Sequence, residues 1–349
     1  MEEEREPVLL VSGKLMETCK AENAWQGPAA VYTTPGKDPL ALSSFSRVEG
    51  SKLSHNNRRD MQGALQTMTH IAAGFQKNFG TVPYIAVGVK HSSPCSAGVS
   101  EVSSLDAIRK MIECRPETIF GGTVLTNFKI DGEDAIELAH HKYGDKRRVL
   151  DVIAGSEVTP CARKTLSRAK GRCRILVNKD VDGAGAARLD TAPLFKYARG
   201  EIQVQSNYTF VFDRKQSYVR CYGEFDLPAW KDLVLAWALG STSPSNTITL
   251  VRDGMVIANA VAQHDRRIAA KLALLIAEDV GHSVDGVVAY SDSFFPVEDA
   301  PKVLIDAGVK TIFTMTGSIR DTEVISYMVN RGVRLVTMPE VFGRGFYGS

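Results

Sequence analysis

Long apolar runs, clustered cysteines and sustained stretches of one charge are all missing from this sequence of 349 residues. No run approaches the roughly 20 residues that a membrane-spanning helix needs, so we expect no membrane partner. Residues 1–6 are acidic where a secretory signal would be basic, which predicts a cytoplasmic protein. The net charge of +2 comes without a basic stripe, which argues against nucleic acid as a partner. The six cysteines follow no metal-ligand spacing and are expected to be reduced.

Alternation of helical and strand patterns organises the rest of the chain. A length of 349 residues with 44% hydrophobic and 23% charged residues suits a globular protein of two domains. Strands that alternate with helices predict an α/β fold whose sheet is covered on both faces. The pattern pauses around Asp190 to Gly200, so we expect two tandem α/β units, residues 1–199 and 200–349.

The individual elements follow from apolar periodicity and from turn residues. Helices are expected at residues 61–75, 103–114, 134–141, 161–170, 230–239, 267–280, 297–307 and 321–330. Strands are expected at residues 84–89, 118–120, 148–153, 173–177, 247–251, 256–260, 287–290, 311–315 and 333–337. The first helix should be capped by Asn57 or Asp60, and Asp253-Gly254 should close a hairpin.

A lysine and a histidine follow the apolar strand that ends near Val89. Open α/β sheets keep their chemistry at strand ends. Lys90 can hold a developing negative charge or supply a proton, and His91 can accept a proton near neutral pH. The pair therefore suits transfer of an acyl group to a weak amine. A solvated lysine beside a hydrogen-bonded histidine is the alternative reading of this dipeptide alone.

Further motifs accompany this pair in a fixed order along the chain. They lie at residues 52–57, 90–91, 120–122, 245–246, 263–266, 291–296 and 317–321. In this order and spacing they resemble the folate-dependent transformylase domain of the bifunctional purine-biosynthesis enzyme that formylates aminoimidazole carboxamide ribonucleotide (AICAR). The resemblance extends from Cys19 to Val336.

The resemblance implies a fold of two tandem cytidine-deaminase-like α/β units without deaminase chemistry. A zinc deaminase of this fold needs His-x-Glu and Pro-Cys-x-x-Cys. Here the segment at Pro94-Cys95 has only the first cysteine, and no His-x-Glu is present. No zinc or other structural metal is therefore expected, although Asp292 matches a position near a potassium site in some relatives. The resemblance also implies a homodimer with composite active sites.

Residue roles come from the same resemblance. It implies that His91 is the base, that Lys90 assists with charge and proton transfer, and that Asn246 contacts the reacting formyl group. A turn asparagine is the alternative for Asn246, and plain core is the alternative for the Phe294-Phe295 pair. The glycines that follow Phe120 permit close approach of either a ligand or a neighbouring segment. The implied pocket for reduced folate is lined by Phe120, Gly121, Gln263, Arg266, Phe294, Pro296 and Asp299.

The phosphate-binding positions depart from the family pattern. Cys19 stands where the family has an arginine, and a second family arginine is missing near Val341. The substitutes expected to bind the acceptor are Lys20, Trp25, Asn56 and Arg344. We predict a formyltransferase that uses 10-formyltetrahydrofolate and an amine acceptor less anionic than the ribonucleotide. The alternatives are an ordinary AICAR formyltransferase and a non-catalytic relative that binds folate or nucleotide.

Overall fold

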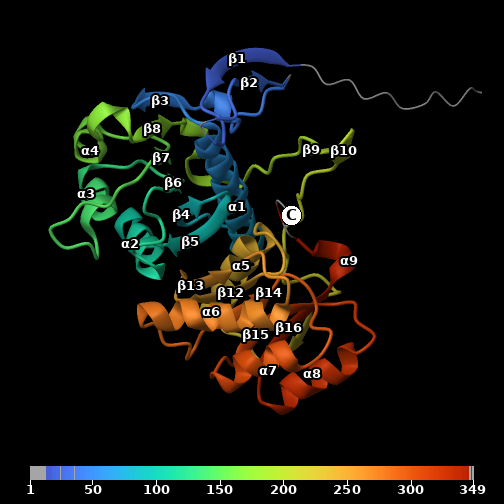
Figure 1. Ribbon diagram of the computed structural model, residues 1–349. Coiled ribbons are helices and arrows are strands. Elements are labelled where there is room, and N and C mark those ends of the chain that lie inside the picture. Colours follow the sequence, from blue (N-terminus) through green and yellow to red (C-terminus); the bar gives the residue numbers. More distant parts are fainter. Residues whose placement is uncertain (1–12, 24, 35, 346, 348–349) are drawn as a thin grey trace, which may run out of the picture.

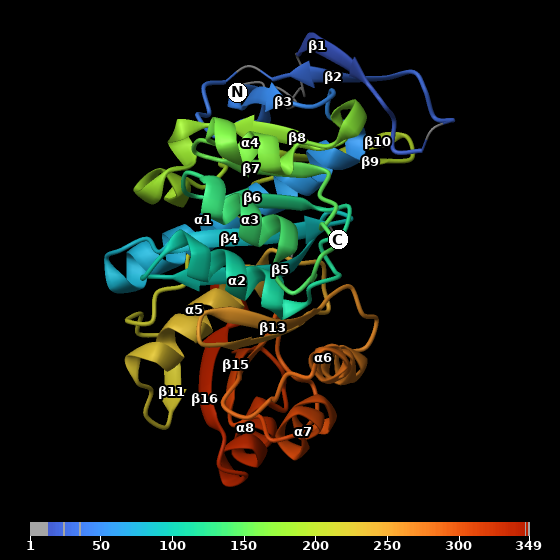
Figure 2. The same ribbon diagram turned by 90° about the vertical axis from the view of Figure 1, so that its left-hand side faces the viewer.

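A single 12-stranded mixed sheet forms the centre of the protein. The computed structural model describes residues 13–23, 25–34, 36–345 and 347. Figure 2 shows the strands of the sheet stacked along the length of the molecule. In spatial order they are β11 (Arg220–Tyr222), β16 (Arg334–Pro339), β15 (Thr311–Thr316), β14 (Val288–Ser291), β12 (Ile248–Arg252), β13 (Met255–Ala260), β5 (Ser93–Ser100), β4 (Tyr84–Lys90), β6 (Thr123–Thr126), β7 (Val152–Gly155), β8 (Arg174–Val177) and β3 (Ser46–Glu49).

The helices occupy matching places in the two halves of the sheet. In each half a helix leads into an antiparallel hairpin, and three further helices connect parallel strands. Short 3-10 helices lie at Leu42–Ser44, Ala169–Gly171, Lys179–Val181 and Gly183–Ala187. The helices are α1 (His55–Phe79), α2 (Ser104–Cys114), α3 (Gly132–His140), α4 (Pro160–Leu166), α5 (Leu227–Ser241), α6 (Arg266–Val280), α7 (Asp299–Asp306), α8 (Asp321–Asn330) and α9 (Glu340–Gly343).

The two halves meet where β13 pairs antiparallel with β5, at Met255 opposite Gly98. This arrangement confirms the predicted mixed α/β fold, and most predicted helices and strands are present within a few residues of their expected limits. The likeness to cytidine deaminases and the boundary at residue 199 stay predictions.

Side chains of a strand alternate between the two faces of the sheet, and so they contribute to different apolar clusters of the core. Val152 and Ala154 of β7 belong to the apolar cluster that contains α1 and α5, while Ile153 belongs to the cluster under α2, α3 and α4. A third cluster lies under α6, α7 and α8. Helices α1 and α5 pack against each other on one face, and the outer helices cover the other (Figure 2). No helix in the described part of the chain combines the length and apolar character needed to cross a bilayer.

Helix α1 begins before the position expected from apolar periodicity. Ser54 is its N-cap and forms a capping box with Asn57, and Gly80 ends the helix in the left-handed conformation at φ 76°. The cap predicted at Asn57 or Asp60 was therefore placed too late, although Asn57 takes part in the capping box. The polar first turn hides this start from a search for apolar residues.

Three sequence predictions are corrected in the first half. Residues 118–120 form turns, and strand β6 begins only after Gly122. The segment predicted as a strand from residue 148 is mostly a loop, because Arg148 is buried and donates to the carbonyls of Pro116, Leu138 and His141. Helix α4 ends at Leu166, short of Lys170. Strand β5 escaped sequence analysis altogether.

Two small hairpins project from the body of the molecule (Figure 1). Strands β1 (Lys14–Cys19) and β2 (Ala29–Thr33) form the first, and β9 (Leu194–Ala198) and β10 (Glu201–Gln205) form the second. Large apolar side chains on both are exposed, including Leu15, Tyr32, Tyr197 and Ile202. Isolated two-stranded hairpins have little stability of their own in water, so these surfaces are suited to contact with another molecule.

Candidate active site

The tight turn between β4 and β5 carries the predicted catalytic pair. Lys90 is the last residue of β4, and His91 and Ser92 both adopt the left-handed conformation, at φ 53° and φ 64°. The turn is held by α1, because the backbone N–H of Ser92 donates to Asp60 Oδ1 at 2.7 Å. His91 is exposed and Lys90 half-buried. Non-glycine residues in this conformation are costly and collect at functional sites.

Asp60 lies near the pair, and Asp151 lies near Asp60. Asp60 is buried, and burial raises the pKa of its carboxyl, while the N–H of Ser92 and the nearby charge of His91 lower it. Asp151 is also close enough for its charge to raise the pKa of Asp60. Arg168 donates to Asp151 Oδ1 at 3.0 Å and holds it in place.

Sequence analysis missed both of these carboxylates. Asp60 was expected to act only as a helix cap, and Asp151 fell inside an expected strand. They reach the same place from α1 and from the segment before β7, 91 positions apart in the chain. No local sequence pattern indicates that these two residues lie close together, since their proximity depends on the order of the strands in the sheet.

The Phe120–Gly122 loop lies beside the end of β4. The N–H of Gly121 donates to Val149 O at 2.8 Å, and Gly122 O accepts from Asp151 N at 3.0 Å. A Cβ on Gly122 would meet Val89 O at 2.7 Å. The lack of a side chain at Gly122 therefore serves contact with the neighbouring strand. Phe120 is exposed next to this contact, and a role of Phe120 and Gly121 in folate binding stays a prediction.

A second cluster surrounds a buried ion pair of the second half. Asp292 is fully buried and accepts from Arg266 Nη2 at 2.9 Å and from Thr247 N at 3.1 Å, and Ser245 Oγ also donates to it. Arg266 Nε donates to Ser291 Oγ at 3.1 Å. Arg266 thus belongs to the frame of this cluster, with its guanidinium already engaged.

Asn246 and Gln263 face each other at the mouth of this frame. Their backbones exchange two hydrogen bonds of 3.1 Å, and Asn246 Nδ2 donates to Gln263 O at 2.8 Å. A carboxamide nitrogen carries two hydrogens. One hydrogen of Asn246 Nδ2 is engaged here, and Asn246 itself lies two residues before β12.

The loop between β14 and α7 carries the predicted folate residues. Phe295 is part of the core, whereas Phe294 is half-buried and lies 3.3 Å from the Cβ position of Gly317. Pro296 is exposed. Asp299 starts α7 with 46% of its side chain exposed, accepts from Ala300 N at 2.7 Å through Oδ1 and lies 3.9 Å from Arg267 through Oδ2. The alternative of a plain core residue therefore holds for Phe295, whereas Phe294 lies beside Gly317.

The two clusters share one edge of the sheet, which we name the Lys–His edge. It joins the β4–β5 turn to the start of β12 and the ends of β13 and β14. Asn259 connects the clusters by donating to Pro94 O at 2.8 Å and to Ser243 Oγ at 3.0 Å. Lys90 ends β4, whereas Asn246 lies two residues before β12, which is three strands away from β4 in the sheet. At ordinary strand spacing this corresponds to roughly 14 Å between the backbones.

A basic cleft of about 580 Å³ opens at the N-terminus of α1. Lys20 O accepts from His55 N at 2.9 Å, and Asn56 Nδ2 donates to Glu22 O at 3.2 Å, which sets both predicted acceptor residues at this helix end. Trp25 is 82% exposed and neither it nor Arg344 lines the cleft. Arg344 lies instead 3.6 Å from Glu340. The charged residues that line the cleft are Lys20, Lys52, Lys170, Arg172 and Arg174.

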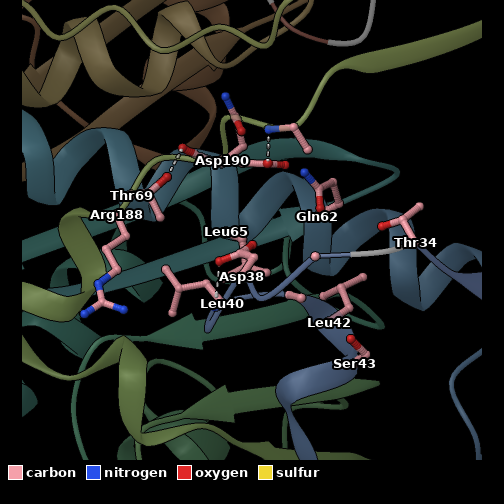
Figure 3. A pocket seen from close by; sticks show the side chains of 14 residues that line it. Thr34, Asp38, Leu40, Leu42, Ser43, Gln62, Leu65, Thr69, Arg188 and Asp190 are labelled. Atoms are coloured by element: carbon pink, nitrogen blue, oxygen red, sulfur yellow. Dashed lines mark hydrogen bonds between the residues drawn. The ribbon is translucent and has the colours of Figure 1, made fainter.

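Another cavity, of about 270 Å³, lies against the side of α1 (Figure 3). Gln62 and Thr69 of α1 face Asp38, Arg188 and Asp190 across it. None of the predicted site residues lines this cavity. Within the described residues, no three His, Cys, Asp or Glu side chains gather in a way that would hold a metal ion.

Comparison with known proteins gives one consistent result. Residues 6–275 match the family described as AICARFT/IMPCHase bienzyme. The chain is 32% identical to the bifunctional purine biosynthesis protein PurH of Anoxybacillus flavithermus over 88% of this chain and 55% of that protein. It is 31% identical to the PurH of Clostridium botulinum over 96% of this chain and 60% of that protein. The chain thus spans between about half and two thirds of the length of these curated relatives.

Proposed function

Because the chain belongs to the AICARFT/IMPCHase bienzyme family, we propose that it is an N-formyltransferase of the AICAR transformylase type that acts in the cytoplasm. The observation that carries this proposal is the Lys90–His91 turn, held by Asp60 and joined along one sheet edge to Asn246 and the Phe294–Asp299 loop. A non-catalytic relative would not need a strained turn with an exposed imidazole near a buried carboxylate.

The residues of the Lys–His edge have complementary tasks in this proposal. His91 accepts the proton that the acceptor amine loses as its nitrogen bonds to the formyl carbon, and Asp60 and Asp151 stabilise the resulting imidazolium. Lys90 stabilises negative charge and returns a proton to the folate nitrogen as its bond to the formyl carbon breaks. The second amide hydrogen of Asn246 holds the formyl oxygen, a contact worth ~2.7–4 kcal/mol in comparable sites.

The residues near Phe294 fit a reduced folate, which supplies the formyl group when it is bound. An aromatic side chain and a carboxylate suit the face and the N–H groups of a pterin, and Phe294, Pro296 and Asp299 provide them on one loop. Arg266 positions this loop through Asp292. That ion pair also weighs against a potassium ion at Asp292, because the carboxylate already accepts from three donors.

A homodimer with composite sites follows from the separation of the two clusters. Roughly 14 Å between the backbones of Lys90 and Asn246 puts one formyl group at the limit of what both side chains can reach within a chain, which favours a site shared by two chains. The exposed apolar hairpins offer surfaces for a second copy. Mixing His91→Ala chains with Asn246→Ala chains should then restore up to about a quarter of the activity, because one site in a mixed dimer is intact. No recovery after confirmed exchange of subunits would contradict shared sites.

The basic cleft bears on the charge of the proposed acceptor. The missing arginine at Cys19 predicts a less anionic amine, but Lys52, Lys170, Arg172 and Arg174 supply positive charge beside Lys20. Asp60 lies about 7.5 Å along α1 from the cleft's end of the helix at 1.5 Å per residue, a distance that a ribose phosphate can span. We therefore propose an acceptor that carries an anionic group.

One comparison tests the function and the acceptor together. Formyl transfer from 10-formyltetrahydrofolate is measured with aminoimidazole carboxamide ribonucleotide and with its dephosphorylated riboside. We expect the ribonucleotide to react at least tenfold better, and the double variant Arg172→Glu, Arg174→Glu to abolish that preference. Preference for the riboside would instead support the less anionic acceptor. Absence of transfer to any amine would favour the non-catalytic relative.

A further inference from the structure

The two halves of the sheet repeat each other down to single hydrogen bonds. Asn127 Oδ1 accepts from Ile85 N at 2.7 Å, and Asn127 N donates to Ile85 O at 3.2 Å. Asp292 makes the same two bonds with Thr247, at 3.1 Å and 3.3 Å. Both hairpins also carry a register shift at the same place before the turn. Residues of the two halves can therefore be matched one to one.

This repeat builds a second edge with the same plan, which we name the opposite edge. Strands β5 and β13 are antiparallel, so the β12–β13 turn lies at the opposite edge beside the starts of β4 and the ends of β5 and β6. In the matched positions Tyr84 takes the place of Asn246, and Glu101 takes the place of Gln263. The buried Asp292 is replaced by the neutral Asn127.

Two adjoining cavities occupy the opposite edge. Their volumes are about 430 Å³ and about 230 Å³, and both are lined by Pro83, Ser100 and Glu101. The ring of Tyr84 is 41% exposed in the larger cavity and packs edge-to-face on Phe128 with 5.7 Å between centroids. Joined cavities of this size are in the range that holds small molecules.

The charges of these cavities limit the chemistry of a ligand. Five carboxyl side chains and two lysines line them. Lys231 pairs with Glu101 at 2.5 Å, and Lys110 pairs with Asp106 at 2.9 Å. The excess is negative, which disfavours phosphate. Carboxylates accept from paired amino and ring N–H groups, and an exposed tyrosine ring offers a face for stacking.

We infer that the opposite edge binds a fused heteroaromatic compound that carries an aminopyrimidine ring and no phosphate, such as an unphosphorylated purine or a pterin. The ring stacks on Tyr84, and Glu101 accepts from its amino group. No counterpart of Asn246 or of the Arg266–Asp292 pair is present in the matched positions, so this edge binds without transferring a formyl group. The inference rests on the repeat and the cavities, and does not depend on the proposed activity.

Calorimetry on the full chain tests this site, with pterin and adenosine as probes. The Phe294→Ala, Asp299→Ala background removes the pterin contacts of the Lys–His edge. At least one of the two probes should still bind this background variant, at the opposite edge. Adding Tyr84→Ala or Glu101→Gln should weaken that binding at least about tenfold. Tyr84→Phe should retain binding, and adenosine monophosphate should bind at least tenfold more weakly than adenosine.

The outcomes of this binding test are independent of the outcome of a formyl-transfer assay. Binding of neither probe in the background variant would overturn the inference, as would residual binding that Tyr84→Ala and Glu101→Gln leave unchanged. Thermal unfolding of each variant identifies any loss of binding that reflects misfolding, and Tyr84→Phe provides the conservative comparison. Formyl transfer can be present or absent in every case, because the readout is binding alone.

Discussion

The β4–β5 turn and the β12–β13 turn occupy matching places in the two halves, but their residues serve different ends. Lys90 and His91 in the first turn correspond to Arg252 and Asp253 in the second. Arg252 donates to the carbonyls of Ser283 and Asp285, and so is used to hold a loop. Among the described residues, Lys90 makes no such loop contact.

Backbone conformation separates the turns as well. Both have two consecutive left-handed residues, but the second turn uses Asp253 and Gly254, residue types that adopt this conformation readily. The first uses His91 and Ser92. Each turn is held by a buried aspartate of the preceding helix, Asp60 or Asp232. The comparison shows that the same hairpin design can be built with residue types that adopt the left-handed conformation readily or with residue types that do not.

The largest effect is expected when the side chains that distinguish the first turn from the second are removed. His91→Ala and Lys90→Met should each lower the single-turnover rate of formyl transfer by ~10²–10⁴-fold, the usual contribution of proton transfer by a positioned group. Folate affinity should change little. Arg252→Met is the matched control and should leave the rate within about twofold. A near-normal rate for His91→Ala would place the base elsewhere, with His55 and His264 as the next candidates.

The second prediction compares the buried ionisable groups of α1 and α5. Burial lowers the pKa of His70 from 6.5 to about 4 and raises the pKa of Asp232 from 3.8 to about 6. Between pH 6.5 and 4 the folded state binds fewer protons at His70 than the unfolded state, so His70 costs stability as pH falls. Asp232 binds more protons when folded between pH 6 and 3.8, so it adds stability as pH falls.

The effects of the two groups on the pH dependence of stability therefore oppose each other, and single substitutions should reveal each effect. Relative to the wild type, His70→Gln should gain roughly 3 kcal/mol of unfolding free energy as pH falls from 6.5 to 4, and Asp232→Asn should lose a similar amount from pH 6 to 3.8. Denaturant unfolding at several pH values measures both. Parallel stability curves for wild type and variants would show that these groups titrate normally in the fold.

The third prediction concerns the folate loop. Asp299→Ala should weaken binding of 10-formyltetrahydrofolate by ~1.5–3 kcal/mol, the range for hydrogen bonds to charged groups. Glu133→Ala provides the comparison, because Glu133 is an exposed acid in the first turn of α3, the matching helix of the first half. Calorimetry measures both variants. Equal affinities for Asp299→Ala and the wild type would remove Asp299 from the pocket.

The smallest expected effect concerns backbone strain. Ser92→Gly should raise the unfolding free energy by ~1 kcal/mol, since glycine adopts the left-handed conformation without the cost that a side chain brings. The reverse change in the second turn, Gly254→Ser, should destabilise the protein, because its Cβ would lie 2.7 Å from Val99 O. Chemical denaturation gives both values. A less stable Ser92→Gly would mean that the serine side chain contributes contacts that outweigh the strain.

Much of the fold could be predicted because its signals are local. Helix α8 was predicted at its observed limits, residues 321–330. The hairpin around Asp253-Gly254 and the end of α6 at Gly281 were also confirmed. Errors arose where distant contacts decide. The predicted strand at residues 118–120 is a turn because Gly122 must pack against Val89, a contact that no local pattern reveals.

The sequence by itself determined most of the elements, the candidate Lys90–His91 pair and the family, because these depend on residue types and spacings along the chain. Only the tertiary structure brought Asp60 to the pair, Asp151 to Asp60, and Lys20 to the distant basic residues of the cleft. Electrostatic and packing energies depend on separation in space and on burial. A 12-stranded sheet orders its strands differently from the chain, so the partners of each site residue were settled only when the strands had been placed.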